Sequence, residues 1–143
     1  MSPKKLYLID PYWKKYGDFF WNGKRTEDIF KSAVKRVQEY DINKVVTMVI
    51  DYDCNFLSDL PDNFFDWVYI DSTHEYEDTL RELEIVSRKV KDEGLIAGHD
   101  WLDNPKSKHY GVHKAIDEWL EKNPDYFLSL RDSKLQWIIK RTK

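Results

Sequence analysis

The sequence has 143 residues, 41% hydrophobic and 34% charged, which indicates one globular core and excludes a disordered chain. The formal net charge is −3, from 23 basic and 26 acidic residues, so no electrostatic footprint for nucleic acid or an anionic membrane surface is expected. Cys54 is the only cysteine, which excludes an intrachain disulfide and a cysteine zinc site and favours a reducing, cytoplasmic setting.

No apolar run in the sequence approaches the ~18 residues needed to span a bilayer, and the N-terminus lacks the hydrophobic region of a signal peptide.

The N-terminal half is predicted to consist of alternating strands and helices. The elements expected here are a strand over 5–10, an aromatic loop over 11–25 with Gly17 and Gly23, a helix from an N-cap at Thr26 to about Tyr40, a strand over 44–50 and a short helix or turn over 54–63.

The C-terminal half continues the alternation. The expected elements are a strand over 64–70, an amphipathic helix over 75–90 that Gly94 ends, a short strand over 95–98, a helix through 112–120 that stops at Asn123-Pro124, and a hairpin whose strands cover 126–130 and 135–140. This order predicts an α/β fold: one domain over 1–143, with a mostly parallel sheet covered by helices on both faces and a C-terminal antiparallel hairpin.

Four of the predicted strands run into an acid, namely Asp10, Asp51, Asp71 and Asp100. Ligands bind outside the carboxyl ends of the strands in such sheets. Any one of these acids could equally cap the helix that follows it. Four of them at one edge favour a polar, ligand-binding rim.

Asp71 and Asp100 follow consecutive strands, so a parallel arrangement would bring their carboxylates together. With His99 they make a ligand set suited to a hard or borderline divalent cation such as Mg²⁺ or Mn²⁺. His74 is a candidate general base, because the pKa of an ordinary histidine lies near neutral pH. The alternative is that Asp71 caps a helix, that His99 packs against Trp101 and that His74 is a surface residue.

A family resemblance is carried by residues 65–101, FDWVYIDSTHEYEDTLRELEIVSRKVKDEGLIAGHDW. Its pattern is an apolar strand, D-x-x-H-x-Y at 71–76, a helix, a turn at Glu93-Gly94, a strand and then His99-Asp100. This stretch resembles class I S-adenosylmethionine-dependent methyltransferases, and among them the small-molecule O-methyltransferases related to the macrocin and mycinamicin sugar methyltransferases and the cephalosporin-biosynthesis protein family. The segment KLYLIDPYW is similar to that family's second strand.

The resemblance implies a Rossmann-like methyltransferase fold and a role for each matching residue. Asp71, His99 and Asp100 would hold Mg²⁺ or Mn²⁺, and His74 would take the proton from a small-molecule hydroxyl acceptor. The ribose of S-adenosylmethionine would lie at Asp10. Its adenine would lie near the acid-rich turn Asp51, Tyr52 and Asp53. His99 departs from the family, in which several relatives carry a carboxylate at that position.

A larger departure lies at the N-terminus. The family's first strand, Gly-rich loop and first helix precede the ribose-binding acid, whereas this sequence starts at what resembles the second strand. Its five glycines form no G-x-G cluster. The expectation is therefore an N-terminally truncated domain with an incomplete S-adenosylmethionine site. The alternatives are that another chain fills the gap or that the protein has given up methyl transfer, and a second copy or another chain could cover the exposed sheet.

Three functions remain open from the sequence. The first is a metal-assisted O-methyltransferase, or the C-terminal part of one. The second is a non-catalytic Rossmann-like remnant that serves as a binding or oligomerisation module. The third, a metal-dependent hydrolase at the same rim, lacks a dedicated nucleophile.

Overall fold

The structure, a computed structural model, describes residues 3–12, 20–21 and 24–142. It divides into two compact units, Met1–Phe56 and Leu57–Lys143. Each unit is described by itself, and the expectation of one domain over the whole chain stays a prediction.

The first unit is built on a pair of parallel strands, β1 and β4. Its elements are β1 (Leu6–Ile9), β2 (Phe20–Trp21), β3 (Lys24–Arg25), α2 (Thr26–Tyr40), β4 (Val46–Val49) and the start of α3 (Asp53–Ser58). Leu6 lies opposite Val46 and Ile9 opposite Val49. The predicted strands and helix are confirmed. Parallel pairing puts Asp10 and Asp51, which follow the two strands, at the same edge.

Two local predictions in this unit need correction. Thr26 is the first helical residue and is buried, whereas Arg25 takes the N-cap position with an extended backbone and no side-chain cap bond. The loop expected over 11–25 lies largely outside the described residues. Within it, β2 and β3 pair as a two-residue antiparallel ladder that the sequence did not suggest.

The second unit holds a four-stranded sheet with the order β5-β6-β8-β7. Its elements are β5 (Phe65–Ile70), α4 (Tyr76–Lys89), β6 (Val90–Gly98), α5 (Tyr110–Lys122), β7 (Tyr126–Arg131) and β8 (Trp137–Arg141). β5 and β6 run parallel, and β8 pairs antiparallel with both β6 and β7. The predicted C-terminal hairpin is confirmed.

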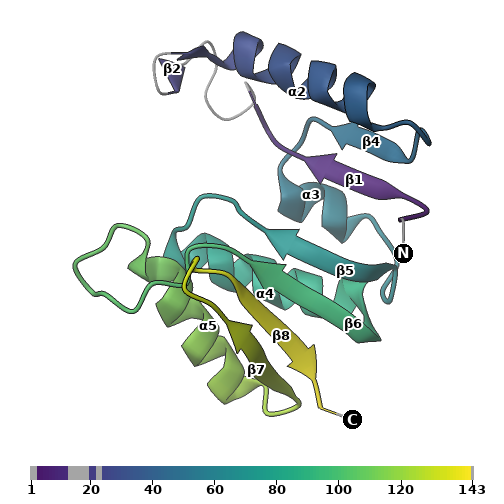
Figure 1. Cartoon of the computed structure of the whole chain (residues 1–143). Coiled ribbons are helices and arrows are strands. Elements are labelled where there is room, and N and C mark those ends of the chain that lie inside the picture. Colours follow the sequence, from purple (N-terminus) through teal and green to yellow (C-terminus); the bar gives the residue numbers. More distant parts are fainter. Residues whose placement is uncertain (1–2, 13–19, 22–23, 143) are drawn as a thin grey trace. The chain divides into compact units, whose positions relative to one another are not determined.

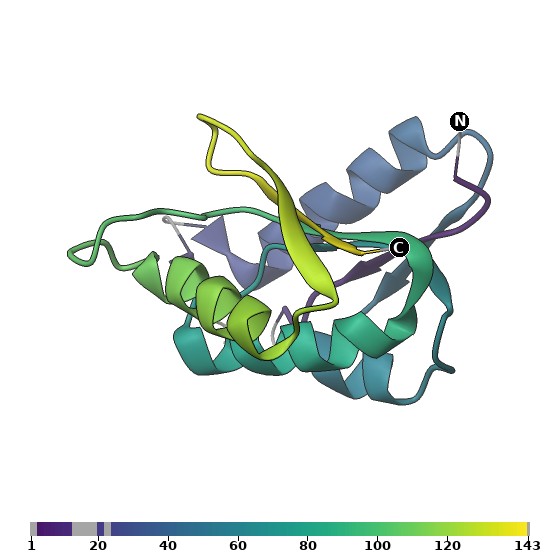
Figure 2. The same cartoon turned by 90° about the horizontal axis from the view of Figure 1, so that it is seen from below.

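Helices α4 and α5 pack side by side against one face of this sheet (Figures 1 and 2). The core consists of the apolar helix residues that face the sheet and the alternate strand residues that face the helices. Its buried members include Leu83, Val86, Val112, Ala115, Ile116, Trp119, Ile96, Trp137 and Ile139. The side chains of Trp137 and Ile139 on β8 thus fill the space between the sheet and the helices.

The helix predicted over 75–90 is confirmed as α4, which ends at Lys89, but the prediction that Gly94 ends it is wrong. Val90 is already extended and opens β6. The buried Lys89 ammonium donates to the Leu60 carbonyl at 2.6 Å and to Asp62 Oδ1 at 2.8 Å, which fixes the end of the helix. Gly94 instead lies within the strand, where an added Cβ would come within 2.7 Å of the Asp66 carbonyl oxygen.

Candidate active site

The candidate site lies in the second unit, where the parallel strands β5 and β6 end beside each other. Ile70 and Gly98 are opposite one another at the end of that ladder. Asp71 therefore follows one strand where His99 and Asp100 follow the other. The sequence expectation that Asp71 and Asp100 converge is met by the geometry of this strand pair.

The backbone of His99 is held from both sides. Its N–H donates to the Ile70 carbonyl at 3.2 Å, and its own carbonyl accepts the indole N–H of Trp137 at 3.0 Å. Gly98 makes this close packing possible, because a Cβ there would come within 2.3 Å of the Trp137 ring and 2.5 Å of the Ile70 carbonyl oxygen. The sheet thus fixes the position of the site from beneath.

His74 sits between two carboxylates. Its Nε2 lies 3.1 Å from Asp71 Oδ1 and 3.0 Å from Asp100 Oδ2. The His74 and Asp100 side chains are only 21% and 16% exposed, whereas Asp71 is 56% exposed. Two carboxylates around one nitrogen favour a proton on Nε2, which leaves the lone pair on Nδ1.

Both His74 and Asp100 have a left-handed backbone, with φ of 64° and 62°. This region is unfavourable for residues other than glycine, and its cost has to be offset by the surrounding packing. Strained residues of this kind gather at functional sites. Two of them in contact at one rim strengthen the assignment of the site.

The three predicted metal ligands can offer donor atoms to one point. One ligand atom each from Asp71, His99 and Asp100 lies within 4.8 Å of the others. His99 Nδ1 is 3.2 Å from Asp100 Oδ2. Two carboxylates and an imidazole at this spacing suit a divalent cation after small side-chain rotations.

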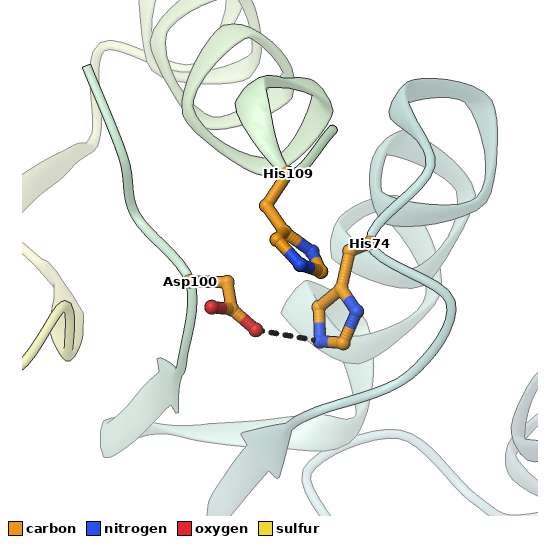
Figure 3. Close-up of side chains that lie close together, drawn as sticks. All are labelled: His74, Asp100 and His109. Carbon is orange, nitrogen blue, oxygen red and sulfur yellow. Dashed lines mark ion pairs between the residues drawn. The ribbon is translucent and has the colours of Figure 1, made fainter. Parts of the chain in front are cut away.

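His109 is a residue of the site that sequence reasoning missed. It precedes α5 and its ring meets the His74 ring edge to face, with centroids 4.8 Å apart. One ligand atom each from His74, Asp100 and His109 also lies within 4.8 Å of the others (Figure 3). The only available signal was a histidine just before a helix at the same sheet edge.

Gly111 and Tyr76 bring α5 against the segment that carries His74. A Cβ on Gly111 would lie 2.8 Å from the His74 carbonyl oxygen and 2.7 Å from the Tyr76 nitrogen. The Tyr76 hydroxyl donates to Glu118 Oε2 at 2.5 Å, and this bond raises the pKa of Tyr76 to about 12. The tyrosine of the D-x-x-H-x-Y pattern thus joins α4 to α5.

The structure does not support the alternatives that Asp71 caps a helix and that His99 packs against Trp101. The N-cap of α4 is Glu75, and the hydrogen bond of Asp71 goes to His74 rather than to the helix start. Trp101 packs edge to face on His113, with ring centroids 4.2 Å apart, rather than on His99.

The residues predicted to bind the cofactor lie in the first unit. Asp10 Oδ1 accepts the Tyr12 N–H at 2.6 Å, and partial desolvation raises the pKa of the Asp10 carboxyl. Asp51 Oδ1 accepts the N–H of Tyr52 at 2.8 Å, and Asp53 Oδ1 accepts the N–H of Cys54 at 2.6 Å. Asp51 and Asp53 therefore shape the start of α3, while the Tyr52 ring is 39% exposed.

In the part of the chain that the structure describes, no helix is both long and apolar enough to cross a bilayer. A family model described as "Methyltransferase domain" matches residues 2–101. No curated protein matches the sequence.

Solved structures share the fold. A protein from Corynebacterium glutamicum aligns with a TM-score of 0.67 and 14% identity, over 97% of this chain and 61% of its own. A methyltransferase from Geobacter sulfurreducens aligns with a TM-score of 0.63 and 14% identity, over 97% and 59%. The O-methyltransferase TomG of tomaymycin synthesis from Streptomyces achromogenes, solved with SAM, aligns with a TM-score of 0.61 and 16% identity, over 82% and 59%.

These alignments confirm the predicted Rossmann-like α/β fold. The chain spans about three fifths of the length of these three proteins.

Proposed function

Because the chain belongs to a family of methyltransferase domains, whose model matches residues 2–101, we propose that it takes part in methyl transfer from S-adenosylmethionine. The acceptor in this proposal is a hydroxyl group of a small molecule, and a divalent cation assists. The observation that carries it is the convergence of Asp71, His74 and Asp100 at one sheet edge, with His74 Nε2 within 3.1 Å of both carboxylates.

Asp71, His99 and Asp100 would hold the cation, Mg²⁺ or Mn²⁺. Their donor atoms fit such an ion in type and in spacing, since one atom from each lies within 4.8 Å of the others. A bound divalent cation supplies charge that holds a hydroxyl oxygen and makes its proton more acidic. The single imidazole in the set makes Mn²⁺ as suitable as Mg²⁺.

His74 would accept the proton of the acceptor hydroxyl. With Nε2 directed at the carboxylates, the lone pair of Nδ1 is free to take that proton. The carboxylates hold the ring in one orientation, and the recess lined by Ile70, Thr79, Val112 and Trp137 beneath it limits its movement. The contribution of the chain is therefore positioning and electrostatics.

The first unit would hold the cofactor. Asp10 follows β1 and would accept the ribose hydroxyls, a role for which the partly desolvated carboxylate is suited. Asp51, Tyr52 and Asp53 follow β4 at the same sheet edge, and the exposed Tyr52 ring offers a surface for the adenine.

The D-x-x-H-x-Y and His-Asp segments support a place among the small-molecule O-methyltransferases related to the macrocin and mycinamicin sugar enzymes. The tomaymycin O-methyltransferase has the same fold. The family match does not favour the non-catalytic alternative.

Calorimetry of the 143-residue chain with S-adenosylmethionine, with and without Mg²⁺, tests the proposal. We expect cofactor binding, and a separate Mg²⁺ binding event that Asp71→Asn weakens. Asp66→Asn is the matched control, because Asp66 is an 81% exposed acid on the preceding strand, away from the site. If millimolar S-adenosylmethionine gives no binding heat, the chain by itself is not the enzyme proposed here.

A further inference from the structure

His109 brings a third imidazole to the candidate site, beside those of His74 and His99, and the proposed reaction does not use it. His74, Asp100 and His109 can each place one ligand atom within 4.8 Å of the other two. His74 Nε2 is already 3.0 Å from Asp100 Oδ2, and Figure 3 shows the His109 ring directed toward this pair. A tetrahedral site with bonds of about 2.0–2.1 Å needs its donors roughly 3.4 Å apart, so only His109 has to rotate.

The environment of His109 points to a ligand. Its Nδ1 is buried and, among the described residues, has no hydrogen-bond partner. A buried polar atom without a partner is costly, and such atoms in native proteins call for an explanation such as an ion. A metal ion bound through the imidazole would draw the ring into a defined orientation.

The backbone around the three residues is arranged for a fixed site. His74 and Asp100 have φ of 64° and 62°, and His109 has φ −98° and ψ 7°, in the bridge region. The His109 N–H donates to Ser107 Oγ at 3.1 Å. The absence of a side chain at Gly111 lets the start of α5 reach the His74 segment.

Two imidazoles and one carboxylate form a different ligand set from the two carboxylates and one imidazole of Asp71, His99 and Asp100. Nitrogen-rich sets suit borderline transition-metal ions, whereas oxygen-rich sets suit Mg²⁺ and Mn²⁺. We propose that His74, Asp100 and His109 bind a borderline divalent ion such as Zn²⁺ or Co²⁺. Asp100 is common to both sets, and its Oδ2 lies within 3.2 Å of both His74 Nε2 and His99 Nδ1, so the two kinds of ion compete for the same oxygen.

The consequence for methyl transfer rests on the proposed function. An ion bound to His74 through Nε2 leaves the ring proton on Nδ1, so that His74 no longer accepts a proton from the acceptor hydroxyl, and it competes with Mg²⁺ for Asp100. Zn²⁺ then inhibits by displacing Mg²⁺ and fixing the base in one step.

The test uses Co²⁺ as a spectroscopic probe on the chelator-treated 143-residue chain. We expect one equivalent of Co²⁺ to give the intense visible absorption of a low-coordinate site, and one equivalent of Zn²⁺ to remove it. His109→Phe keeps the ring but not the ligand atom, and should weaken Co²⁺ binding on the order of 10- to 100-fold. Asp100→Asn should abolish it.

The matched control is Asp71→Asn, which removes a carboxylate ligand of the other set but keeps a polar side chain of the same size beside His74. It should keep Co²⁺ binding within about threefold while it weakens Mg²⁺ binding. His109→Gln serves if His109→Phe does not fold, as judged by circular dichroism. The proposal is overturned if Co²⁺ gives no such absorption, if a folded His109 variant binds Co²⁺ like the parent, or if Asp71→Asn abolishes Co²⁺ binding. Because the readout is metal binding, it is independent of whether S-adenosylmethionine binds.

Discussion

At the scale of single residues, the His74 ring is held by two neighbouring side chains. Its Nε2 lies within 3.1 Å of the carboxylates of Asp71 and Asp100, which follow two different strands. A residue held in this way is oriented by its neighbours rather than by solvent. Its removal should therefore affect the proton transfer more than the assembly of the fold.

His74→Ala should lower the turnover number for methyl transfer by about 10²–10⁴-fold, the usual contribution of a general base. The affinity for S-adenosylmethionine should change little, because the residues proposed to bind it lie in the other unit. Steady-state kinetics with calorimetry on the same samples separate the two effects. A variant that keeps its turnover but loses the cofactor would show that His74 has a binding role.

The hydrogen bond from the Tyr76 hydroxyl to Glu118 raises the pKa of Tyr76 to about 12, and Tyr76→Phe removes this bond. The folded protein therefore holds this proton more tightly than the unfolded chain, in which the pKa is about 10. The stability due to the bond is complete below pH 10 and is lost as the pH rises toward 12. The variant should melt at a lower temperature than the parent near neutral pH.

Thermal melts across that range check the prediction. The difference in melting temperature between parent and Tyr76→Phe should vanish between pH 10 and pH 12. Tyr40→Phe, at a tyrosine that is 76% exposed on α2, should show no difference at any pH. A constant difference through pH 12 would mean that the hydroxyl acts by packing.

The sequence predicted that Asp71, His74, His99 and Asp100 would lie close together, because strand ends and spacing encode their positions along the chain. It missed His109, whose place beside His74 depends on how α5 packs on α4. That packing depends on Gly111, which has no side chain to signal it, and on a bond between Tyr76 and Glu118, 42 residues apart. Contacts of this range leave no periodic pattern.

At the scale of secondary-structure elements, the start of α5 lies against the backbone of residues 74–76 with no room for a side chain at Gly111. Gly111→Ala would normally favour a helix by up to about 1 kcal/mol. Here the new Cβ would lie 2.7–2.8 Å from backbone atoms of Tyr76 and His74, neither of which can move aside like a side chain. We expect a net loss of roughly 1–3 kcal/mol in the free energy of unfolding.

Urea denaturation measures this loss, and Glu121→Ala on the exposed face of the same helix is the control, expected to be near neutral. The same variant should weaken Co²⁺ binding, since the turn that carries His109 moves with the helix start. A Gly111→Ala protein as stable as its parent would show that α5 can shift at no cost.

The sequence predicted where α4 ends but not why it ends there. The helix expected over 75–90 ends at Lys89, because the polypeptide turns there into β6 and the Lys89 ammonium is bound by the Leu60 carbonyl and Asp62. The sequence predicts that Gly94 ends the helix, but its role in the structure is to let β6 approach the Asp66 carbonyl. A glycine alone does not distinguish these two uses.

At the scale of the whole molecule, the sheet of the second unit has apolar side chains on the face opposite its helices α4 and α5. Trp67, Tyr69, Phe127 and Leu130 are 47%, 43%, 44% and 46% exposed. They alternate along β5 and β7 with residues that face α4 and α5. Exposed apolar side chains that gather on one face of a sheet can mark an interface. We expect a second copy to cover this face.

Trp67→Ser combined with Tyr69→Ser should shift self-association of the chain to at least tenfold higher concentration, because it removes two large aromatic contacts. Sedimentation velocity over a range of concentrations measures the shift. Tyr40→Ser, at an exposed tyrosine of the first unit, should leave it unchanged. A parent chain that is monomeric at high micromolar concentration would rule out a second copy as the cover.

The sequence predicted the α/β class and every strand of the parallel pairs, but not which strands are neighbours. In the first unit β1 pairs with β4, and in the second β5 pairs with β6. Pairing is a relation between segments, and the hydrophobic runs specify which segments are strands rather than which are neighbours.

The close backbone contact at Gly111 also predicts how this position varies among related sequences. Since the helix start and the His74 segment meet without a side chain between them, a relative could gain a residue at this position only by giving up the neighbouring geometry. Among relatives that keep the histidine of D-x-x-H and a histidine at position 109, glycine at 111 should be nearly invariant. In relatives without a histidine at position 109, residues other than glycine should occur more often at position 111. An alignment deep enough to count these pairs would reveal whether the two positions have been inherited as a unit.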